Sequence, residues 1–351
     1  MTNWRKGWLA DELAKPQSST ILGHRGDLPQ PPNSAVCNLY HYLTMCFVGL
    51  CLLATAVVAA NDVLPPVTAL AFTPDGEAVV VGSQAGLEVR SWPELSHVRT
   101  LPTELYHVHD LAFSPDGKNL AVVGGAPADS GTIELFGWPA GELLRRDSPH
   151  SDLIYSVDWR ADSKTLATAS ADRSVRICEV ASGATIHVLE GHSRGVLSVV
   201  YLPGEFGLAT AGIDESVRLW DIGNAKVLRT LPNHTRAVHD LAVRPGGGDA
   251  PPMLASIGAD RTVRLWQPTL GRLMRFVRVK SIPFAVGWTD DGSMLVTACK
   301  DGSVCLIDSE TVEVLKDIPA LDGVAYSLAM ARDGSVLVGG ENGQLRRVVL
   351  K

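Results

Sequence analysis

The chain lacks the excess of basic residues that nucleic-acid binding requires. It contains 31 Lys and Arg residues against 38 Asp and Glu residues, which gives a formal net charge of −7. Neutralisation of phosphates by Lys and Arg supplies most of the affinity for nucleic acid. No run of like charge is long enough to form a binding tail. We therefore expect no nucleic-acid partner.

Cysteine pairs with the spacing of zinc ligands are also missing. The six cysteines include no CxxC pair, and no Cys/His spacing suits zinc. Three of them (Cys37, Cys46 and Cys51) lie in or beside one apolar stretch, so the six do not form a disulfide framework. The sequence thus predicts no resident cofactor and no zinc centre.

Charged residues are absent from residues 28–61. Within this stretch, residues 42–60 are 19 apolar or small residues, and a helix of that length, at about 1.5 Å per residue, roughly matches a bilayer core of about 30 Å. Basic residues precede the stretch and Asp62 follows it, so the positive-inside rule places the N-terminus in the cytoplasm. The small residues 58–60 also suit a signal-peptidase site.

These patterns divide the chain into three parts. We expect residues 1–41 to be poorly ordered, residues 42–60 to form a single transmembrane or signal segment, and residues 61–351 to form the folded domain. The alternative is that the apolar residues form a strand of the folded domain and that the protein is cytoplasmic.

From Val67 onward the chain repeats a pattern of short strands. Each copy has an alternating first strand, a turn, a second strand such as LATAG (208–212) and a third strand such as VRLWD (217–221). Four of the turns read TPDG, SPDG, TDDG and ARDG, and their glycine can take a positive φ. The large residues that end the first strands recur every 41 to 46 residues, at Phe72, Phe113, Trp159, Tyr201, Val243, Trp288 and Met330.

Repeats of about 40–45 residues that hold several short strands are typical of β-propeller blades. Seven copies therefore predict an all-β, seven-bladed propeller of four-stranded blades. The residues GH at 191–192, LATAG, Asp214 and VRLWD make the chain resemble the WD-repeat (WD40) family over residues 67–351. More loosely, it resembles bacterial WD40 proteins that are exported, which implies a propeller outside the cell or anchored to the outer side of the inner membrane.

The resemblance implies a repeated polar set in the blades. In the family, a His before the first strand, a Ser or Thr in the second strand, an Asp in the next turn and a Trp in the third strand are hydrogen-bonded together. The matching residues are His192, Thr210, Asp214 and Trp220; His234, Ser256, Asp260 and Trp266; and His150, Thr168 and Asp172, with Cys178 in the place of Trp.

Such a His, Ser/Thr and Asp grouping also resembles a hydrolase triad. Three copies, each inside its own repeat, indicate architecture, because catalysis needs only one site. We therefore predict a non-catalytic, monomeric scaffold. The alternative is a hydrolase or lactonase-like enzyme with its site at the central channel, although the sequence shows no unrepeated cluster of carboxylates or histidines for one.

The resemblance further implies that a protein or peptide partner binds the narrow top face of the propeller. The matching positions flank the start of each first strand and carry aromatic, His and aliphatic side chains of the kind that interface cores favour. The predicted contact residues are His107, His109, Leu153, Tyr155, Leu197, His239, Phe284 and Tyr326, and the other positions of the ring are Pro66, Thr68, Gly195, Ala237, Ile282 and Val324. We expect no metal ion at His107, His109 and His239, because histidines from separate blades rarely converge.

Two features stay open at this point. The last repeat ends on its third strand, so a closing strand would come from residues 55–64, as a short strand near Asn61–Leu64 or as the ATAVVAA segment itself; the second choice leaves no membrane segment. Cys299 and Cys305 flank Gly302 symmetrically and could face each other across a hairpin, where a disulfide would depend on their geometry.

Overall fold

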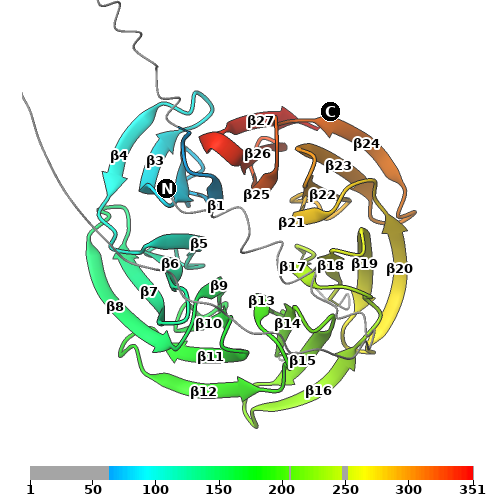
Figure 1. The fold of residues 1–351 in the computed structure, drawn as a ribbon, viewed down its shortest axis with the longest axis horizontal. Helices are drawn as coiled ribbons and strands as arrows, with labels where there is room; N and C mark the ends of the chain where they lie inside the picture. Colours follow the sequence, from blue (N-terminus) through cyan, green and yellow to red (C-terminus); the bar gives the residue numbers. More distant parts are fainter. Residues whose placement is uncertain (1–62, 205–206, 247–251, 351) are drawn as a thin grey trace, which may run out of the picture. The chain divides into compact units, whose positions relative to one another are not determined.

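The computed structural model describes residues 63–204, 207–246 and 252–350. These residues form seven antiparallel sheets arranged in a ring (Figure 1). Six sheets have four strands and the seventh has three. The only helical element in these ranges is a 3-10 turn, η2 (Glu341–Gly343). The prediction of a seven-bladed, all-β propeller is confirmed.

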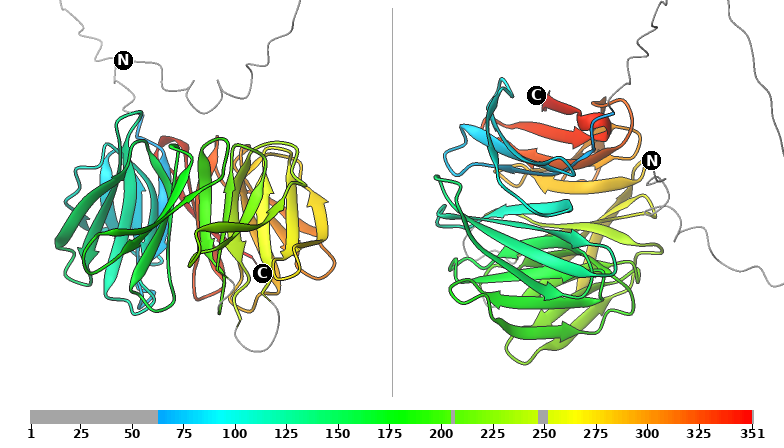
Figure 2. Two further views of the ribbon diagram at one scale, coloured as in Figure 1. Left: turned by 90° about the horizontal axis from the view of Figure 1, so that it is seen from below. Right: turned by 60° about the vertical axis from the view of Figure 1, so that its left-hand side comes forward.

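Each blade is a meander whose strands pair in chain order, from the channel outward (Figure 1). The strands are β1–β4 (Val67–Phe72, Ala78–Ser83, Gly86–Ser91, His97–Leu101), β5–β8 (His107–Phe113, Asn119–Ala126, Ser130–Gly137, Leu143–His150), β9–β12 (Ile154–Trp159, Thr165–Ser170, Ser174–Glu179, Thr185–Glu190), β13–β16 (Val196–Tyr201, Leu208–Gly212, Val217–Asp221, Lys226–Leu231), β17–β20 (Val238–Val243, Leu254–Gly258, Thr262–Gln267, Arg272–Arg278), β21–β24 (Pro283–Trp288, Met294–Cys299, Ser303–Asp308, Val314–Pro319) and β25–β27 (Ala325–Met330, Ser335–Gly340, Leu345–Val349). Figure 2 shows the blades from the side, with their connecting loops gathered at two opposite faces.

The core lies between neighbouring blades. A second strand such as β14 is buried at every residue, because both faces of its sheet pack against adjacent sheets. Trp220 and Trp266 are fully buried and belong to the clusters that join blade four to its neighbours on either side. The outer strands are largely exposed, as the pattern of β20 shows. Apolar burial between the blades is therefore what holds the ring together.

The predicted turns adopt the conformation that their sequence requires. Gly76, Gly117, Gly292 and Gly334 end the four turns with φ between +64° and +79°. Side chains with a Cβ rarely adopt this left-handed region, which explains the glycine in each turn.

The first and last blades meet side by side. Ser327 Oγ in β25 donates a hydrogen bond to the carbonyl of Val67 in β1 at 3.3 Å, and Val67 packs in one cluster with Leu337 of the last blade. Arg332 Nη1 donates to the carbonyl of Asp75 at 3.1 Å. Side chains therefore join the two ends of the ring.

The last sheet ends at β27, and no fourth strand pairs with it within residues 63–204, 207–246 and 252–350. Val63 and Leu64 lie outside any strand, so the prediction of a closing strand near Asn61–Leu64 is wrong for these two residues. The ATAVVAA segment and the predicted parts 1–41 and 42–60 lie outside the described residues. In the part of the chain that the structure describes, no helix is long and apolar enough to cross a membrane.

The hairpin of Cys299 and Cys305 has a different register from the one that symmetry about Gly302 suggests. Cys305 lies opposite Thr297, and Ala298 opposite Val304, so the two cysteines are diagonal neighbours and do not face each other. Their sulfur atoms are 3.9 Å apart, and both are free thiols. Diagonal neighbours have Cα atoms about 7–8 Å apart, whereas a disulfide usually needs about 4.4–6.8 Å.

Candidate functional site: the polar sets and the top face

The His, Thr, Asp and Trp set of blade four is hydrogen-bonded throughout. His192 Nε2 lies 2.7 Å from Thr210 Oγ1, and its Nδ1 lies 3.0 Å from both carboxylate oxygens of Asp214. Trp220 Nε1 donates to the same Thr210 oxygen at 2.8 Å. The loop before β13, the middle of β14, the β14–β15 turn and β15 each supply one member, so the set ties together two strands, a loop and a turn.

Blade five repeats this arrangement and blade three keeps part of it. His234 Nε2 lies 2.7 Å from Ser256 Oγ, to which Trp266 Nε1 donates at 2.8 Å, and Asp260 lies 3.0 Å from His234 Nδ1. In blade three, His150 lies 2.9 Å from Thr168 Oγ1 and 2.8 Å from Asp172. Cys178, in the Trp position, instead has its sulfur 3.7 Å from the hydroxyl of Thr185.

The aspartates of these sets are held in the ionised form. Burial alone would raise the pKa of Asp214, but hydrogen bonds and charge from His192, with a hydrogen bond from Ser216, outweigh it and hold this pKa well below its usual range. The pKa values of Asp172 and Asp260 are lowered by the same balance. Burial lowers the pKa of His234 despite its carboxylate partner.

The hydroxyl groups of the polar sets are too buried to reach a substrate as nucleophiles. The side chains of Thr168, Thr210 and Ser256 are completely buried. The oxygens of Thr210 and Ser256 are also occupied by a tryptophan N–H. An activated hydroxyl must reach its substrate, so this geometry suits a structural role, as expected from the threefold repetition.

A second repeated set, which the sequence reasoning did not identify, lies on the innermost strands. Asp110, Asp158 and Asp240 each accept a hydrogen bond from a backbone N–H of the next blade, donated by Val157 at 3.0 Å, Tyr201 at 2.6 Å and Val286 at 3.0 Å respectively. Each also accepts one from the N–H of the following residue in its own strand. These carboxylates therefore link neighbouring blades around the channel.

Burial makes these three carboxylates hard to ionise. Loss of water contact raises the pKa of Asp110 to about 6, and those of Asp158 and Asp240 to about 7, although the backbone hydrogen bonds act in the opposite direction. Negative charge on Asp110 adds to the rise at Asp158 and Asp240. A raised pKa can mark an acid–base catalyst, but here each carboxylate makes the same contacts in its own blade.

A sequence signal for part of this set was present. The pentapeptide VHDLA occurs twice, at residues 108–112 and 238–242, with its Asp at Asp110 and Asp240. Asp158, in SVDW, lies outside this pattern, because it comes one residue before Trp159, whereas Asp110 comes three residues before Phe113. The partner N–H groups lie 43 to 47 residues further along, so analysis of spacing inside one repeat does not bring them together.

The predicted top-face residues fall into two runs of ring contacts. On one side of the channel, the rings of Tyr106, His107, His109 and Tyr155 follow one another at centroid distances of 4.6, 6.0 and 5.1 Å. On the other side, His239 stacks on Phe284 at 4.9 Å, and Phe284 lies 5.9 Å from Tyr326. The structure thus brings six of the eight predicted contact residues into aromatic clusters.

The remaining predicted positions are aliphatic. Leu153 is buried beside the start of β9, and Leu197 in β13 is half-buried.

His239 Nδ1 lies 2.9 Å from the carbonyl of Pro283 in the next blade, which orients the His239 ring. In the described ranges, no three His, Cys, Asp or Glu side chains are placed to hold a metal ion.

The buried His109 is chemically distinct within the first run. Burial, with a small contribution from the nearby His107, lowers its pKa to about 4, so its ring is neutral near pH 7. Its Nε2 atom is buried and has no hydrogen-bond partner among the residues that the structure describes. A buried polar atom without a partner is costly.

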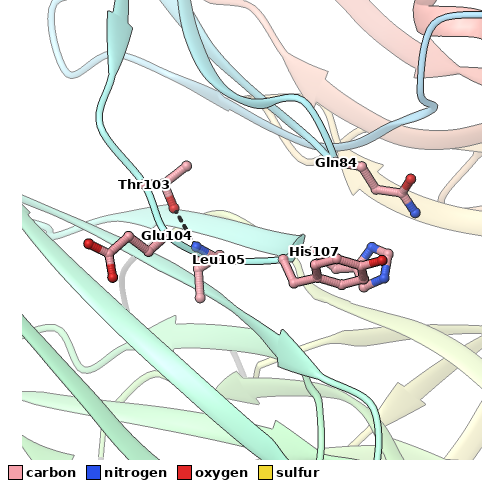
Figure 3. A pocket seen from close by; sticks show the side chains of 6 residues that line it. Gln84, Thr103, Glu104, Leu105 and His107 are labelled. Atoms are coloured by element: carbon pink, nitrogen blue, oxygen red, sulfur yellow. Dashed lines mark hydrogen bonds between the residues drawn. The ribbon is translucent and has the colours of Figure 1, made fainter.

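A cavity of about 420 Å³ lies beside the same run (Figure 3). The loop between β4 and β5 forms one wall, where Thr103 and Leu105 are joined by a hydrogen bond of 3.1 Å, and Gln84 lies opposite His107. Tyr106, which also lines the cavity, is 61% exposed. A side chain of a bound partner would fit within this volume.

Seven meander sheets in a ring, with the same buried polar set repeated in successive blades, define a β-propeller built from sequence repeats. Residues 141–179, 183–221, 225–267 and 279–308 match the family model of the WD domain, G-beta repeat. Over these four segments the chain is similar to WD40 repeats.

Curated relatives match shorter regions. A WD repeat-containing protein VIP3 of Arabidopsis thaliana is 32% identical over 112 residues, which cover 29% of this chain and 34% of the relative. WD repeat-containing protein 1 of Xenopus tropicalis is 39% identical over 82 residues, which cover 22% of this chain and 13% of the relative. A chromatin assembly factor 1 subunit FAS2 homolog of rice is 30% identical over 156 residues, which cover 39% of this chain and 30% of the relative. The chain thus spans about a third or less of these relatives.

All three relatives are eukaryotic. They therefore give no support to the expected resemblance to exported bacterial proteins.

Proposed function

We propose that this protein is a non-catalytic scaffold that binds a protein or peptide partner through the top face of its propeller. WD40-repeat proteins are typically scaffolds for protein interactions.

The observation that carries the proposal is the clustering of aromatic and imidazole rings around the mouth of the channel. Blades two and three supply His107, His109 and Tyr155, and blades five to seven supply His239, Phe284 and Tyr326. Rigid rings offer a large contact area for a small loss of conformational entropy, and interface hot spots are rich in them.

The first run also offers polar recognition. His107 lines the cavity bounded by Thr103 and Gln84, and the ring of His109 follows that of His107 at a centroid distance of 6.0 Å. A partner side chain that enters this cavity would contact Tyr106 and His107, at the start of the first run of rings. This favours a peptide or loop that enters the mouth of the ring over a flat protein surface.

An enzyme at the channel is less well supported. The buried aspartates of the inner strands, Asp110, Asp158 and Asp240, each accept a hydrogen bond from a backbone N–H of the next blade, which is a structural contact repeated in three blades. A catalytic centre needs an unrepeated group of acid, base and substrate-positioning residues.

We further propose that the apolar residues 42–60 export the protein or anchor it to a membrane, with the propeller outside the cytoplasm. The support for this is their length and lack of charge together with the basic residues that precede them. Fractionation of cells that express the tagged full chain tests it: the protein is expected in the membrane or exported fraction, and soluble full-length protein in the cytoplasm would contradict it.

The binding face can be tested by site-specific photo-crosslinking. A photoreactive amino acid is placed at Leu197 on the top face or, as a control, at Val98 on an outer strand, where the side chain is 57% exposed. We expect a discrete crosslinked protein from position 197 and none from position 98. Equal crosslinking from both positions, or crosslinking from Val98 alone, would refute the assignment of the face.

A further inference from the structure

Positive charge is concentrated in one blade of this acidic protein. Residues 261–289 contain six Arg or Lys residues and no Asp or Glu, although the whole chain has a formal net charge of −7. Four of the six lie on or just after β20, the outer strand of blade five: Arg272, Arg275, Arg278 and Lys280. This surface is on the outer rim of the ring and separate from the mouth of the channel (Figure 1).

β20 is an edge strand with unusual side chains. It is the last strand of its sheet, so its outward N–H and C=O groups have no strand partner in the described part of the chain. Met274 and Phe276 are 43% and 55% exposed. Alternation along a strand places Phe276 and Arg278 on one face and Arg275 and Val277 on the other, so cations flank the edge on both sides.

The three arginines of β20 are not neutralised within the propeller. Within residues 63–204, 207–246 and 252–350, none of Arg272, Arg275 and Arg278 forms an ion pair. The outer strand β8 differs, because Arg145 lies 2.5 Å from Asp147 and Arg146 lies 2.7 Å from Glu134. Edge strands commonly carry charge that deters aggregation, but an uncompensated positive edge also attracts a negatively charged segment.

A groove adjoins the edge between the outer strands of blades five and six. Its volume is about 390 Å³, and the exposed Val314 and Leu315 of β24 form its apolar side. Lys316 and Arg278 line it as well, while the one carboxylate in the lining, Asp317, is engaged by Lys280 at 2.7 Å. The groove therefore combines an apolar floor with positive charge at its rim.

We propose that the β20 edge and this groove bind an extended acidic peptide segment of a partner protein, independently of the top face. The peptide adds a strand to β20 through main-chain hydrogen bonds, which supply affinity in this mode of recognition. Its carboxylates meet Arg272, Arg275 and Arg278, which suit planar, bidentate pairing, and an apolar side chain enters the groove.

The observations favour a peptide over an anionic membrane or nucleic acid. The unpaired backbone groups of β20 match another strand, whereas a lipid surface has no regular row of donors and acceptors to meet them. The apolar residues line a narrow concave groove, which suits one side chain better than a flat bilayer. The remainder of the chain is acidic and would repel a long polyanion.

The test uses the purified full-length protein and a fluorescent seven-residue peptide of alternating glutamate and leucine, followed by fluorescence anisotropy. The variant R272Q/R275Q/R278Q is expected to weaken binding by about tenfold or more, because it removes the charge-assisted contacts. The control variant K118Q/K164Q/R346Q removes the same charge at exposed positions on other blades and is expected to bind as the wild type does.

Further probes separate the possible modes. A peptide of the same sequence with alternate amides methylated is expected not to bind, because it cannot extend the sheet. The top-face variant Y155A/F284A/Y326A is expected to bind the acidic peptide normally, so that failure of the top-face proposal and failure of this one are distinguishable. Vesicles containing phosphatidylserine are expected not to bind.

Three results would overturn the inference. Equal affinity for the wild type and R272Q/R275Q/R278Q would remove the role of the arginines. Unchanged binding of the methylated peptide would exclude strand addition. Vesicle binding that requires the three arginines, without binding of the acidic peptide, would assign the surface to a membrane.

Discussion

A carboxylate oxygen of Asp158, in the inner strand of blade three, accepts a hydrogen bond of 2.6 Å from the backbone N–H of Tyr201, in the inner strand of blade four. Asp110 and Asp240 make the same contact at two further blade boundaries. Inner strands are sheet edges, and their unpaired N–H groups would otherwise be left beside the channel. The propeller therefore uses side chains of one blade to complete the backbone hydrogen bonding of the next.

This arrangement predicts a pH-dependent stability. The pKa of Asp158 in the folded protein is about 7, above the value of about 3.9 for Asp in an unfolded chain. The folded state therefore holds a proton that the unfolded state has lost between these pH values, and the stability linked to Asp158 falls as the pH rises through this window.

Melting temperatures of the wild type and D158N, measured from pH 5 to pH 8, test this linkage. D158N cannot ionise, so its melting temperature relative to the wild type is expected to increase as the pH rises. The exposed variant D291N serves as a control and is expected to show no such trend, because the pKa of Asp291 lies near 2. A constant difference between D158N and the wild type across this range would show that Asp158 does not titrate there.

The polar sets predict unequal costs for removing equivalent hydroxyls. T210A deprives both His192 Nε2 and Trp220 Nε1 of a buried partner. T168A deprives His150 and, at 3.4 Å, the carbonyl of Arg176, but no tryptophan, because Cys178 replaces the tryptophan of that blade. An orphaned buried donor or acceptor costs about 1–3 kcal/mol. We expect T210A to lower the free energy of unfolding by more than T168A.

Urea denaturation of T210A, T168A and the conservative variant T210S measures this difference. T210S retains the hydroxyl and is expected to recover most of the stability that T210A loses. A loss as large in T210S as in T210A would mean that the methyl group of Thr210, and not its hydroxyl, makes the important contact.

The spacing of the blades sharpens the prediction of a closing strand. In the six four-stranded blades, the outer strand begins 10 to 12 residues before the first strand of the next blade. Counted back from Val67, this spacing predicts a start at residues 55–57, within ATAVVAA. A strand at this position would pair with the open edge of β27, where Val349 is 59% exposed, and would leave no membrane segment, so it is the alternative to the export proposed above.

Two shortened chains, beginning at residues 54 and 63, test the closing strand. If the closing strand forms, the longer chain melts higher, by roughly 2–4 °C for each kcal/mol that the strand contributes, and the amides of Leu345–Val349 are protected from hydrogen exchange. This result would contradict the proposed membrane or export segment. Identical melting and exchange of the two chains would favour a membrane or cleaved segment at residues 42–60.

The repeating strands and turns could be predicted from the sequence because their signals are local. Within each repeat, the alternating first strand, the large residue that ends it and the turn that follows are adjacent in the chain. The spacing of His192, Thr210 and Asp214 likewise reflects their place within one blade. Contacts inside a blade were therefore accessible to sequence reasoning.

Contacts that depend on hairpin register or on neighbouring blades were not accessible in the same way. Three residues connect β22 to β23, with Gly302 at φ +77°, which centres the hairpin on Asp301 and makes Cys299 and Cys305 diagonal. The contact of Asp158 with Tyr201 depends on how two blades pack, and no spacing within one repeat encodes it.

Binding of a partner through the top face can be tested by affinity purification with the variant Y155A/F284A/Y326A. The matched control V98A/L144A/I186A removes three exposed apolar side chains from the outer strands β4, β8 and β12. Both variants are first shown by circular dichroism to melt cooperatively, and the partner recovered with the wild type is then titrated against each. We expect the top-face variant to lose this partner while the outer-strand control retains it. Unchanged recovery and affinity with Y155A/F284A/Y326A would contradict binding through the top face.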